Sequence, residues 1–251
     1  MDTRFFRVTL YSLLGILGLS LGAFLPYSLL GEGIFLLFCL LPALFEHRKK
    51  DVSLFPLLPK RWLSSLLFLP LLLGVTVGVS AITTLLFPSL APQAAPLSFT
   101  AVLTSALSPA IGEELLFRLV ALSLLLPYGK RFAVITSALL FALFHQSLYQ
   151  MPYALAAGVV LALAALYSHS LLLPVFLHFA NNLLSLLIGK HLTPLLVFLL
   201  VGSGIVSGVL LYLLYRRGVK NAKTKVPFAF PSIIPLLLYA AYCILMAVLK
   251  L

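Results

Sequence analysis

The chain has 251 residues, of which 62% are hydrophobic and only 9% carry a charge. A soluble domain carries about 25% charged residues, because a large part of its surface must face water. Six acids and seventeen bases cannot cover such a surface. The composition therefore excludes a soluble globular domain, a disordered chain and a disulfide scaffold. The apolar runs are continuous rather than alternating, which favours membrane-spanning helices over a membrane barrel.

In chain order, the apolar runs predict an all-α, polytopic transmembrane helix bundle of about eight or nine spans. They cover about residues 5–25, 33–45, 62–87, 100–126, 131–148, 152–168, 171–189, 193–215 and 231–249. The second run is short enough to be a half-span or one arm of a tilted hairpin. The first follows two arginines, as a signal peptide would, but its apolar stretch is long, so we expect the helix to be retained.

The distribution of bases predicts the orientation of the spans. When the N-terminus is placed in the cytoplasm, fourteen of the seventeen bases lie on the cytoplasmic side, including those of the basic loop 216–227. Only Lys190 and Lys250 lie on the other side. The sequence thus predicts an integral multi-pass membrane protein whose N-terminus and basic loops are cytoplasmic. The net charge of +11 is then explained by topology and anionic lipid, and not by nucleic acid.

Two adjacent acids, Glu113 and Glu114, fall inside the fourth span, and Arg118 follows four residues later. Glu114 and Arg118 are spaced to meet on one helix face and form a structural ion pair. Glu113 points about 100° away, so it needs a partner on another helix. Intramembrane charges are functional candidates by default, although a salt-bridge network without chemistry is the alternative. The remaining acids are predicted to lie at the terminus or in loops: Asp2, Glu32, Glu46 and Asp51.

Two histidines accompany this cluster in later spans. His145 ends an apolar run late in the fifth span, and His178 lies in the seventh, with Asn182 on the same face. Prolines precede Glu113 and His178 by four residues and can kink their helices. The other histidines are predicted to be solvated or interfacial: His47, His169 and His191.

These residues form three ordered motifs, E-E-x-x-x-R (113–118), F-x-x-x-H (141–145) and H-x-x-x-N (178–182). Together they resemble those of the CPBP family, also called the Abi family, which comprises CAAX prenyl proteases and bacteriocin-processing enzymes. The resemblance covers roughly residues 100–190 and implies an intramembrane endopeptidase. It divides the chain into N-terminal spans (1–99), a catalytic core (100–190) and C-terminal spans with the basic loop (191–251).

The resemblance also implies a role for each motif residue. Glu113 would be the general base that activates water, and His145 would help to hold that water. His178 and Asn182 would stabilise the tetrahedral oxyanion, and Glu114 with Arg118 would be the structural pair. The expected mechanism needs no cofactor, and the expected partners are the lipid bilayer and a peptide or lipidated protein, prenylated proteins of the CAAX type included. The oligomeric state is left open.

Three other interpretations remain at this point. The first is a zinc-dependent membrane protease in which Glu113, His145 and His178 bind the ion, with water as the fourth ligand. The second is a transporter with a buried proton relay, and the third is a non-catalytic immunity or scaffold protein. No H-E-x-x-H motif occurs. Cys39 and Cys243 lie in other apolar runs and are expected to be inert core residues.

Overall fold

The computed structural model describes residues 3–25, 28–48, 62–91, 96–188, 191–215 and 234–249. Every regular element in these ranges is helical, and none of them contains a strand. The predicted all-α fold is confirmed. The predicted basic loop 216–227 lies outside the described residues.

The helices follow the order of the predicted spans. The first four are α1 (Arg4–Ala23), α2 (Ser28–Arg48), the short α3 (Trp62–Ser65) and α4 (Phe68–Leu86), after which comes the 3₁₀ turn η1 (Pro88–Leu90). One continuous helical stretch then comprises α5 (Phe99–Val102), η2 (Leu103–Leu107), α6 (Ser108–Glu114), η3 (Leu115–Leu122), α7 (Ser123–Leu125) and the 3₁₀ turn η4 (Leu126–Tyr128). The last five are α8 (Lys130–Phe144), α9 (Gln150–Ser168), α10 (Leu172–Ile188), α11 (Pro194–Tyr215) and α12 (Ile234–Val248).

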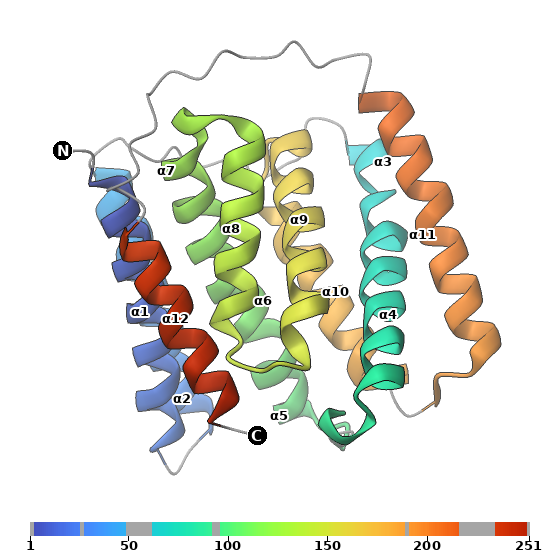
Figure 1. Cartoon of the computed structure of the whole chain (residues 1–251), viewed down its shortest axis with the longest axis horizontal. Coiled ribbons are helices and arrows are strands. Elements are labelled where there is room, and N and C mark those ends of the chain that lie inside the picture. Colours follow the sequence, from blue (N-terminus) through green and yellow to red (C-terminus); the bar gives the residue numbers. More distant parts are fainter. Residues whose placement is uncertain are drawn as a thin grey trace.

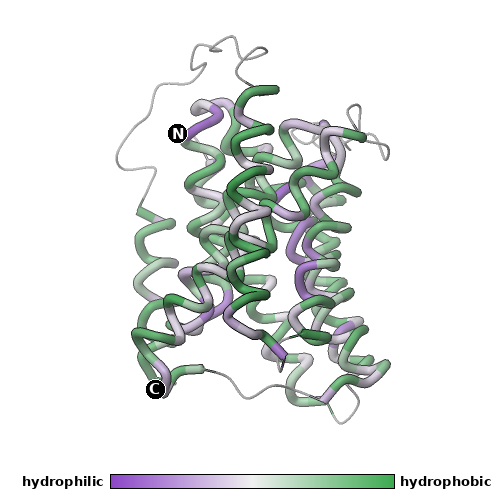
Figure 2. The backbone as a smooth tube through the Cα atoms, turned by 90° about the vertical axis from the view of Figure 1, so that its right-hand side faces the viewer, coloured by the Kyte–Doolittle hydropathy of each residue, from purple (hydrophilic) through white to green (hydrophobic). Residues whose placement is uncertain are grey.

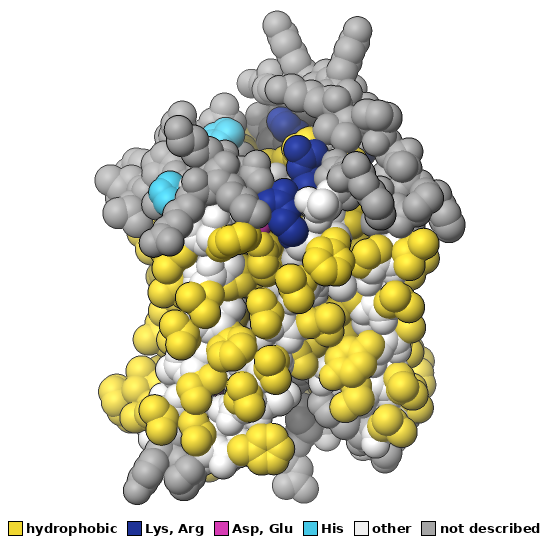
Figure 3. Space-filling model, turned by 90° about the vertical axis from the view of Figure 1, so that its left-hand side faces the viewer, with side chains coloured by type: hydrophobic (Ala, Val, Ile, Leu, Met, Phe, Trp, Pro, Cys, Tyr) yellow, Lys and Arg dark blue, Asp and Glu magenta, His cyan; other side chains and the backbone are white. Residues whose placement is uncertain are grey.

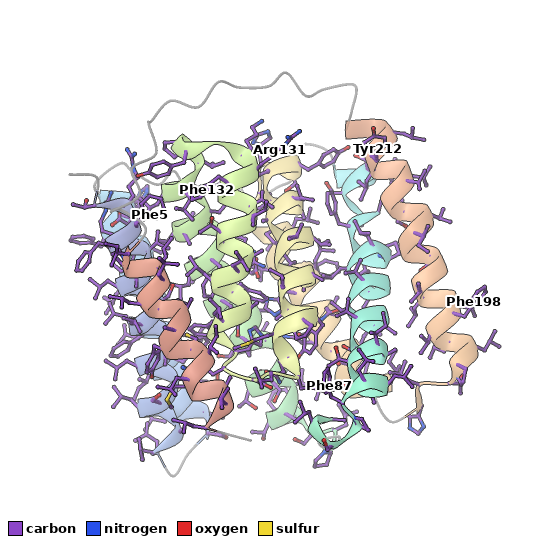
Figure 4. The ribbon with its side chains drawn as sticks, viewed as in Figure 1. Phe5, Phe87, Arg131, Phe132, Phe198 and Tyr212 are labelled. Carbon is purple, nitrogen blue, oxygen red and sulfur yellow. The ribbon has the colours of Figure 1, made fainter. Side chains whose placement is uncertain are left out.

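The helices form one bundle in which successive long helices run in opposite directions (Figure 1). Helices α6, α8, α9 and α10 occupy its centre, whereas α1, α2 and α12 cover one side and α4 and α11 the other. At one end of the bundle the rings of Phe5 and Phe132 lie side by side, 5.9 Å apart (Figure 4). The segment that carries the first two motifs is therefore enclosed by helices from both termini.

The outside of the bundle is apolar along most of its length. The helices are mostly hydrophobic (Figure 2), and the visible face has a broad band of hydrophobic side chains below an end where lysines and arginines gather (Figure 3). Phe198 is 73% exposed and points away from α11 (Figure 4). Five described helical stretches are long and apolar enough to cross a membrane, namely α1, residues 28–47 and 63–86, α9 and residues 194–214. Helices α10 and α12 are shorter and also apolar, as expected for a multi-pass membrane protein.

The second span is longer than the sequence predicts. Helix α2 has 21 residues, whereas the apolar run covers only 33–45. The sequence places the end of this span too early, because Glu46 belongs to the helix and not to a loop. Glu46 is completely buried, its Oε2 lies 2.6 Å from Nη1 of Arg7, and its Oε1 accepts a hydrogen bond from the Tyr11 hydroxyl at 2.5 Å. These partners on α1 allow a carboxylate to be buried inside the helix.

Two further residues that were predicted to lie in loops are also in α2. Glu32 is half-buried near its start, and His47 is exposed in its last turn. A hydropathy pattern places the end of a span at such side chains. A helix can continue past them when they are paired or reach water. Cys39 and Cys243 are buried and free, as expected for core residues.

The fifth span ends earlier than predicted, at Phe144 rather than at residue 148. His145 caps α8, and its Nδ1 bonds to the carbonyl oxygen of Phe141 at 2.9 Å. Gln146 has a φ of 47°, in the left-handed region, which turns the chain away from the helix axis. His145 is thus placed at a helix end, where its ring can reach across the bundle.

The fourth span is not a regular α-helix. Its seven-residue α6 lies between two π-helical segments, η2 and η3. Pro109 sits in the first turn of α6, which directly follows η2. A π-helical turn accommodates an extra residue and often marks a functional site, because it changes the direction of the side chains on either side.

Glycines set the spacing of the outer helices. A Cβ atom on Gly74 of α4 would lie 2.6 Å from the carbonyl oxygen of Leu200 and 2.8 Å from the Cα of Gly204, both on α11. The two backbones therefore touch at this crossing. Small residues that permit close backbone approach are a common basis of helix packing in membranes, where lipid competes for apolar contacts.

Replacing Gly204 by leucine should force α4 and α11 apart and lower the free energy of unfolding by about 1–3 kcal/mol, a typical cost of overpacking. Thermal unfolding of the detergent-solubilised protein measures the effect. Gly202→Leu is the matched control, since a Cβ there has no neighbour within 4 Å. Equal stability of the two variants would show that this crossing does not hold α11 in place.

Candidate active site

A cavity of about 590 Å³ lies within the bundle, between α4, α6, α9 and α10. Its wall contains Glu113, His145, His178 and Asn182. The structure thus brings all four predicted catalytic residues to one cavity, from three helical segments far apart in the sequence. Another cavity, of about 510 Å³, is lined only by apolar residues of α8, α9 and α12 and contains none of the four.

Arg118 and Glu114 form the predicted ion pair. Nε of Arg118 lies 3.0 Å from Oε2 of Glu114, and both side chains are completely buried. The guanidinium carbon also lies 4.3 Å from the ring centroid of Phe141, so the π face provides a second favourable contact for the cation. The two contacts offset part of the cost of burying a charged arginine in a membrane. The spacing of four residues already predicted the contact with Glu114.

Glu114 has a second partner that the sequence did not indicate. Its Oε1 lies 2.9 Å from Nδ1 of His178, on α10. A carboxylate paired with arginine can only accept, so His178 donates this hydrogen bond from Nδ1. Glu114 therefore fixes both the guanidinium on its own helix and the imidazole of a helix packed against it, and this leaves Nε2 of His178 directed elsewhere.

Glu113 faces the other nitrogen of the same imidazole. Its Oε2 lies 3.9 Å from Nε2 of His178, and the residue is 7% exposed. This carboxylate oxygen makes no hydrogen bond within the described part of the chain. The two adjacent acids thus bracket one histidine, but Glu114 lies within 3.0 Å of both Arg118 and His178, whereas Glu113 lies 3.9 Å from His178 and lines the cavity.

His145 is oriented by the end of its own helix. Because a carbonyl oxygen can only accept, its bond to the Phe141 carbonyl places a proton on Nδ1. Nε2 is then left for the cavity, as an acceptor when the ring is neutral. A water held there could be polarised by Nε2 on one side and by a carboxylate on the other.

Phe141, the first residue of the F-x-x-x-H motif, connects these groups. Its ring centroid lies 4.9 Å from that of His145 and 5.6 Å from that of His178, with interplanar angles of 71° and 75°. The guanidinium of Arg118 also lies over the face of this ring. Such edge-to-face contacts restrict ring rotation, so Phe141 fixes the relative positions of both histidines. Phe141 is part of the F-x-x-x-H motif, but the spacing of that motif did not indicate that its ring contacts both histidines.

Sequence reasoning also missed several polar residues of the wall. Asn181 adjoins Asn182, and its Oδ1 accepts a hydrogen bond of 2.8 Å from the Thr76 hydroxyl on α4. Thr76 and Ser80 both line the cavity and are four residues apart, and Tyr149 and Tyr153 complete this side. The regular spacing of hydroxyl residues along an otherwise apolar span was the signal that could have identified α4 as a wall of the cavity.

The zinc interpretation finds no assembled ligand set. Within the described ranges, no three histidine, cysteine, aspartate or glutamate side chains form a group that could hold a metal ion. The described residues therefore do not fit the Glu113, His145 and His178 site.

Fold and site together define a class of protein, a membrane-embedded helical bundle with carboxylates and histidines around a central cavity. The family model of the Rce1-like type II CAAX prenyl endopeptidases matches residues 95–184. This part of the chain belongs to that family, a protease family within the CPBP group. The match includes all three motifs and confirms the family expected from them. Neither the curated proteins nor the solved structures contain a match to this chain.

Glu114→Gln should destabilise the protein, because Arg118 would then be buried without a countercharge. Breaking one partner of a buried pair typically costs about 3–5 kcal/mol. Chemical unfolding in detergent measures this loss. Adding Arg118→Met should restore much of the stability, since the uncompensated cation is removed with its partner. A single variant as stable as the parent would contradict the structural role of Glu114.

Proposed function

We propose that this chain is an intramembrane endopeptidase that hydrolyses a peptide bond of a membrane-associated substrate, with Glu113 as the general base. The observation that carries this proposal is the difference between the surroundings of the two acids. Glu114 lies 3.0 Å from Arg118 and 2.9 Å from His178, whereas Glu113 is 3.9 Å from His178 and lines the cavity together with His145 and Asn182. Membership of the central segment in a protease family supports the same activity.

In the proposed reaction, a water molecule lies between Glu113 and Nε2 of His145. Glu113 takes a proton from the water, and the oxygen of that water attacks the carbonyl carbon. The carbonyl thereby becomes a tetrahedral oxyanion. When the intermediate collapses, the C–N bond breaks, and Glu113 gives the same proton to the leaving amine. The carboxylate is thereby regenerated, so that protons balance over one turnover.

The oxyanion would be stabilised by the side-chain amide of Asn182 and by Nε2–H of His178. His178 already donates from Nδ1 to Glu114, so donation from Nε2 requires the imidazolium form. With that form, two carboxylates (Glu113 and Glu114) face two cations (Arg118 and His178), and the buried cluster is neutral. Removing one preorganised donor from such a site typically costs a factor of about 10²–10³ in kcat.

The proposed substrate is a polypeptide segment that is already held in or at the bilayer. A cavity within an apolar bundle suits such a segment, and lipidated proteins, including prenylated proteins of the CAAX type, belong to this class. The bilayer would then act as a partner that concentrates and orients the substrate.

Glu113→Gln should abolish cleavage, with kcat/KM falling by about 10²–10⁴, the usual contribution of a general base. The change is isosteric and leaves Glu114, Arg118 and His178 in place, so insertion and stability should change little. Sequencing of new protein termini in membranes from cells expressing each variant identifies substrates, and the purified protein then gives the rates.

Glu32→Gln is the comparison variant, because this acid on α2 does not line the cavity and acts on Glu113 only through its charge. Termini produced by the parent and by Glu32→Gln, but absent with Glu113→Gln, are the expected result. Full cleavage by Glu113→Gln would overturn the proposal. Repeating the assay with a chelator separates the two protease mechanisms, since a zinc enzyme would lose activity and the proposed enzyme would not.

A further inference from the structure

The chain leaves helix α8 through a residue with a strained backbone. Gln146 follows His145 directly, and its φ of 47° lies in the left-handed region, which residues other than glycine, asparagine and aspartate rarely adopt. The side chain of Gln146 is buried but does not line the cavity that His145 lines. A backbone conformation of this kind persists only where the surrounding structure holds it in place. The contacts of Gln146 therefore help to decide where the turn, and with it His145, is placed.

One contact of Gln146 comes from the C-terminal helix. The Gln146 side chain is in polar contact with the thiol of Cys243 on α12, and the same thiol contacts the hydroxyl of Tyr239, one turn away on that helix. Tyr239 in turn reaches the hydroxyl of Ser12 on α1. All four side chains are buried. Because a buried polar group that loses its partner is costly, these contacts join the turn after α8 to two helices outside the catalytic segment.

Helix α12 is suited to this role by its place and by its buried face. It packs on α1 and α8 (Figure 1) and lies outside the segment that matches the family model, 95–184. Its buried residues are Leu236, Tyr239, Cys243 and Ala247. Only Tyr239 and Cys243 among them have polar groups, and both take part in the contacts with Ser12 and Gln146.

The other contacts of the turn leave this task to Gln146. The bond from Nδ1 of His145 to the Phe141 carbonyl orients the ring relative to its own helix, and the Tyr149 hydroxyl bonds to that of Thr84 at the far end of the turn. Neither contact holds the end of α8 against α12. Gln146 does so, at the residue next to His145.

We propose that Gln146 is a positioning residue, through which α12 holds His145 in the place that the reaction requires. The inference rests on the proposed function, because it specifies how the water between Glu113 and His145 is kept in line. A misplacement of about 1 Å can lower a rate by a factor of about 10². Loss of the contact should therefore lower kcat and leave KM unchanged, since neither Gln146 nor Cys243 lines the cavity.

Gln146→Gly separates the side chain from the backbone. Glycine adopts a positive φ without strain, so the turn itself should be retained. We expect kcat to fall by about tenfold or more at unchanged KM. Cys243→Ala should have the same effect from the other helix, whereas Cys243→Ser keeps a polar group of similar size and should retain most of the activity. Because both single changes break one contact, the double variant should be no slower than the slower single variant.

Leu236→Ala is the matched control, since it removes a buried apolar side chain from the same helix. It should lower stability but not kcat. A Gln146→Gly variant as fast as the parent would overturn the proposal. So would losses that add up in the double variant, or an equal loss of kcat in Leu236→Ala. If Gln146→Gly does not fold, the comparison of Cys243→Ala with Cys243→Ser decides the matter.

A measurement without substrate separates this inference from the proposed function. Nitrogen NMR of isotope-labelled histidine in the detergent-solubilised protein reports the surroundings of the His145 ring, and a His145→Gln sample assigns the signal. The signal should shift or broaden in Gln146→Gly and Cys243→Ala, but not in Leu236→Ala. An unchanged signal in all variants would overturn the positioning role, whatever Glu113→Gln does. Full cleavage by Glu113→Gln, with the expected shifts, would overturn only the proposed chemistry.

Discussion

A guanidinium enclosed within a membrane bundle needs a carboxylate beside it, and in this chain Glu114 provides it for Arg118. A charged residue at the centre of a membrane helix costs roughly 2.5–3.5 kcal/mol on insertion scales. Glu114 offsets this cost with one oxygen and holds His178 with the other. The pair thus connects the fourth span to α10, and Phe141 packs against Arg118 and His178 from α8. The site depends on this contact, because it brings three helices into register.

The same contact explains how two adjacent, chemically identical acids can differ in role. Successive residues of a helix point about 100° apart. One acid, Glu114, therefore faces the packed interior, where it contacts Arg118 and His178, and the other lines the cavity. Oε2 of Glu113 lies 3.9 Å from Nε2 of His178 and makes no hydrogen bond within the described residues.

What could be predicted from the sequence follows from the range of the interactions. The pairing of Glu114 with Arg118 depends only on helix geometry, so the spacing of four residues was sufficient. The bond from His178 to Glu114 joins residues 64 positions apart and depends on how α10 packs. Glu46 was assigned to a loop because hydropathy cannot detect partners 35 and 39 residues away. The position of His145 at a helix end likewise depends on a left-handed residue after it, which no glycine or asparagine signals.

In the proposed reaction, Glu113 acts on a substrate whose oxyanion is held by His178 and Asn182. A structure of the protein with a phosphinate peptide tests it most directly, because the tetrahedral phosphorus mimics the intermediate of hydrolysis. One phosphinate oxygen should lie about 3 Å from the Asn182 amide and from Nε2 of His178, as oxyanion donors require, and the other beside Glu113. An inhibitor bound with its phosphinate against Glu114, or in the apolar cavity between α8, α9 and α12, would contradict the account.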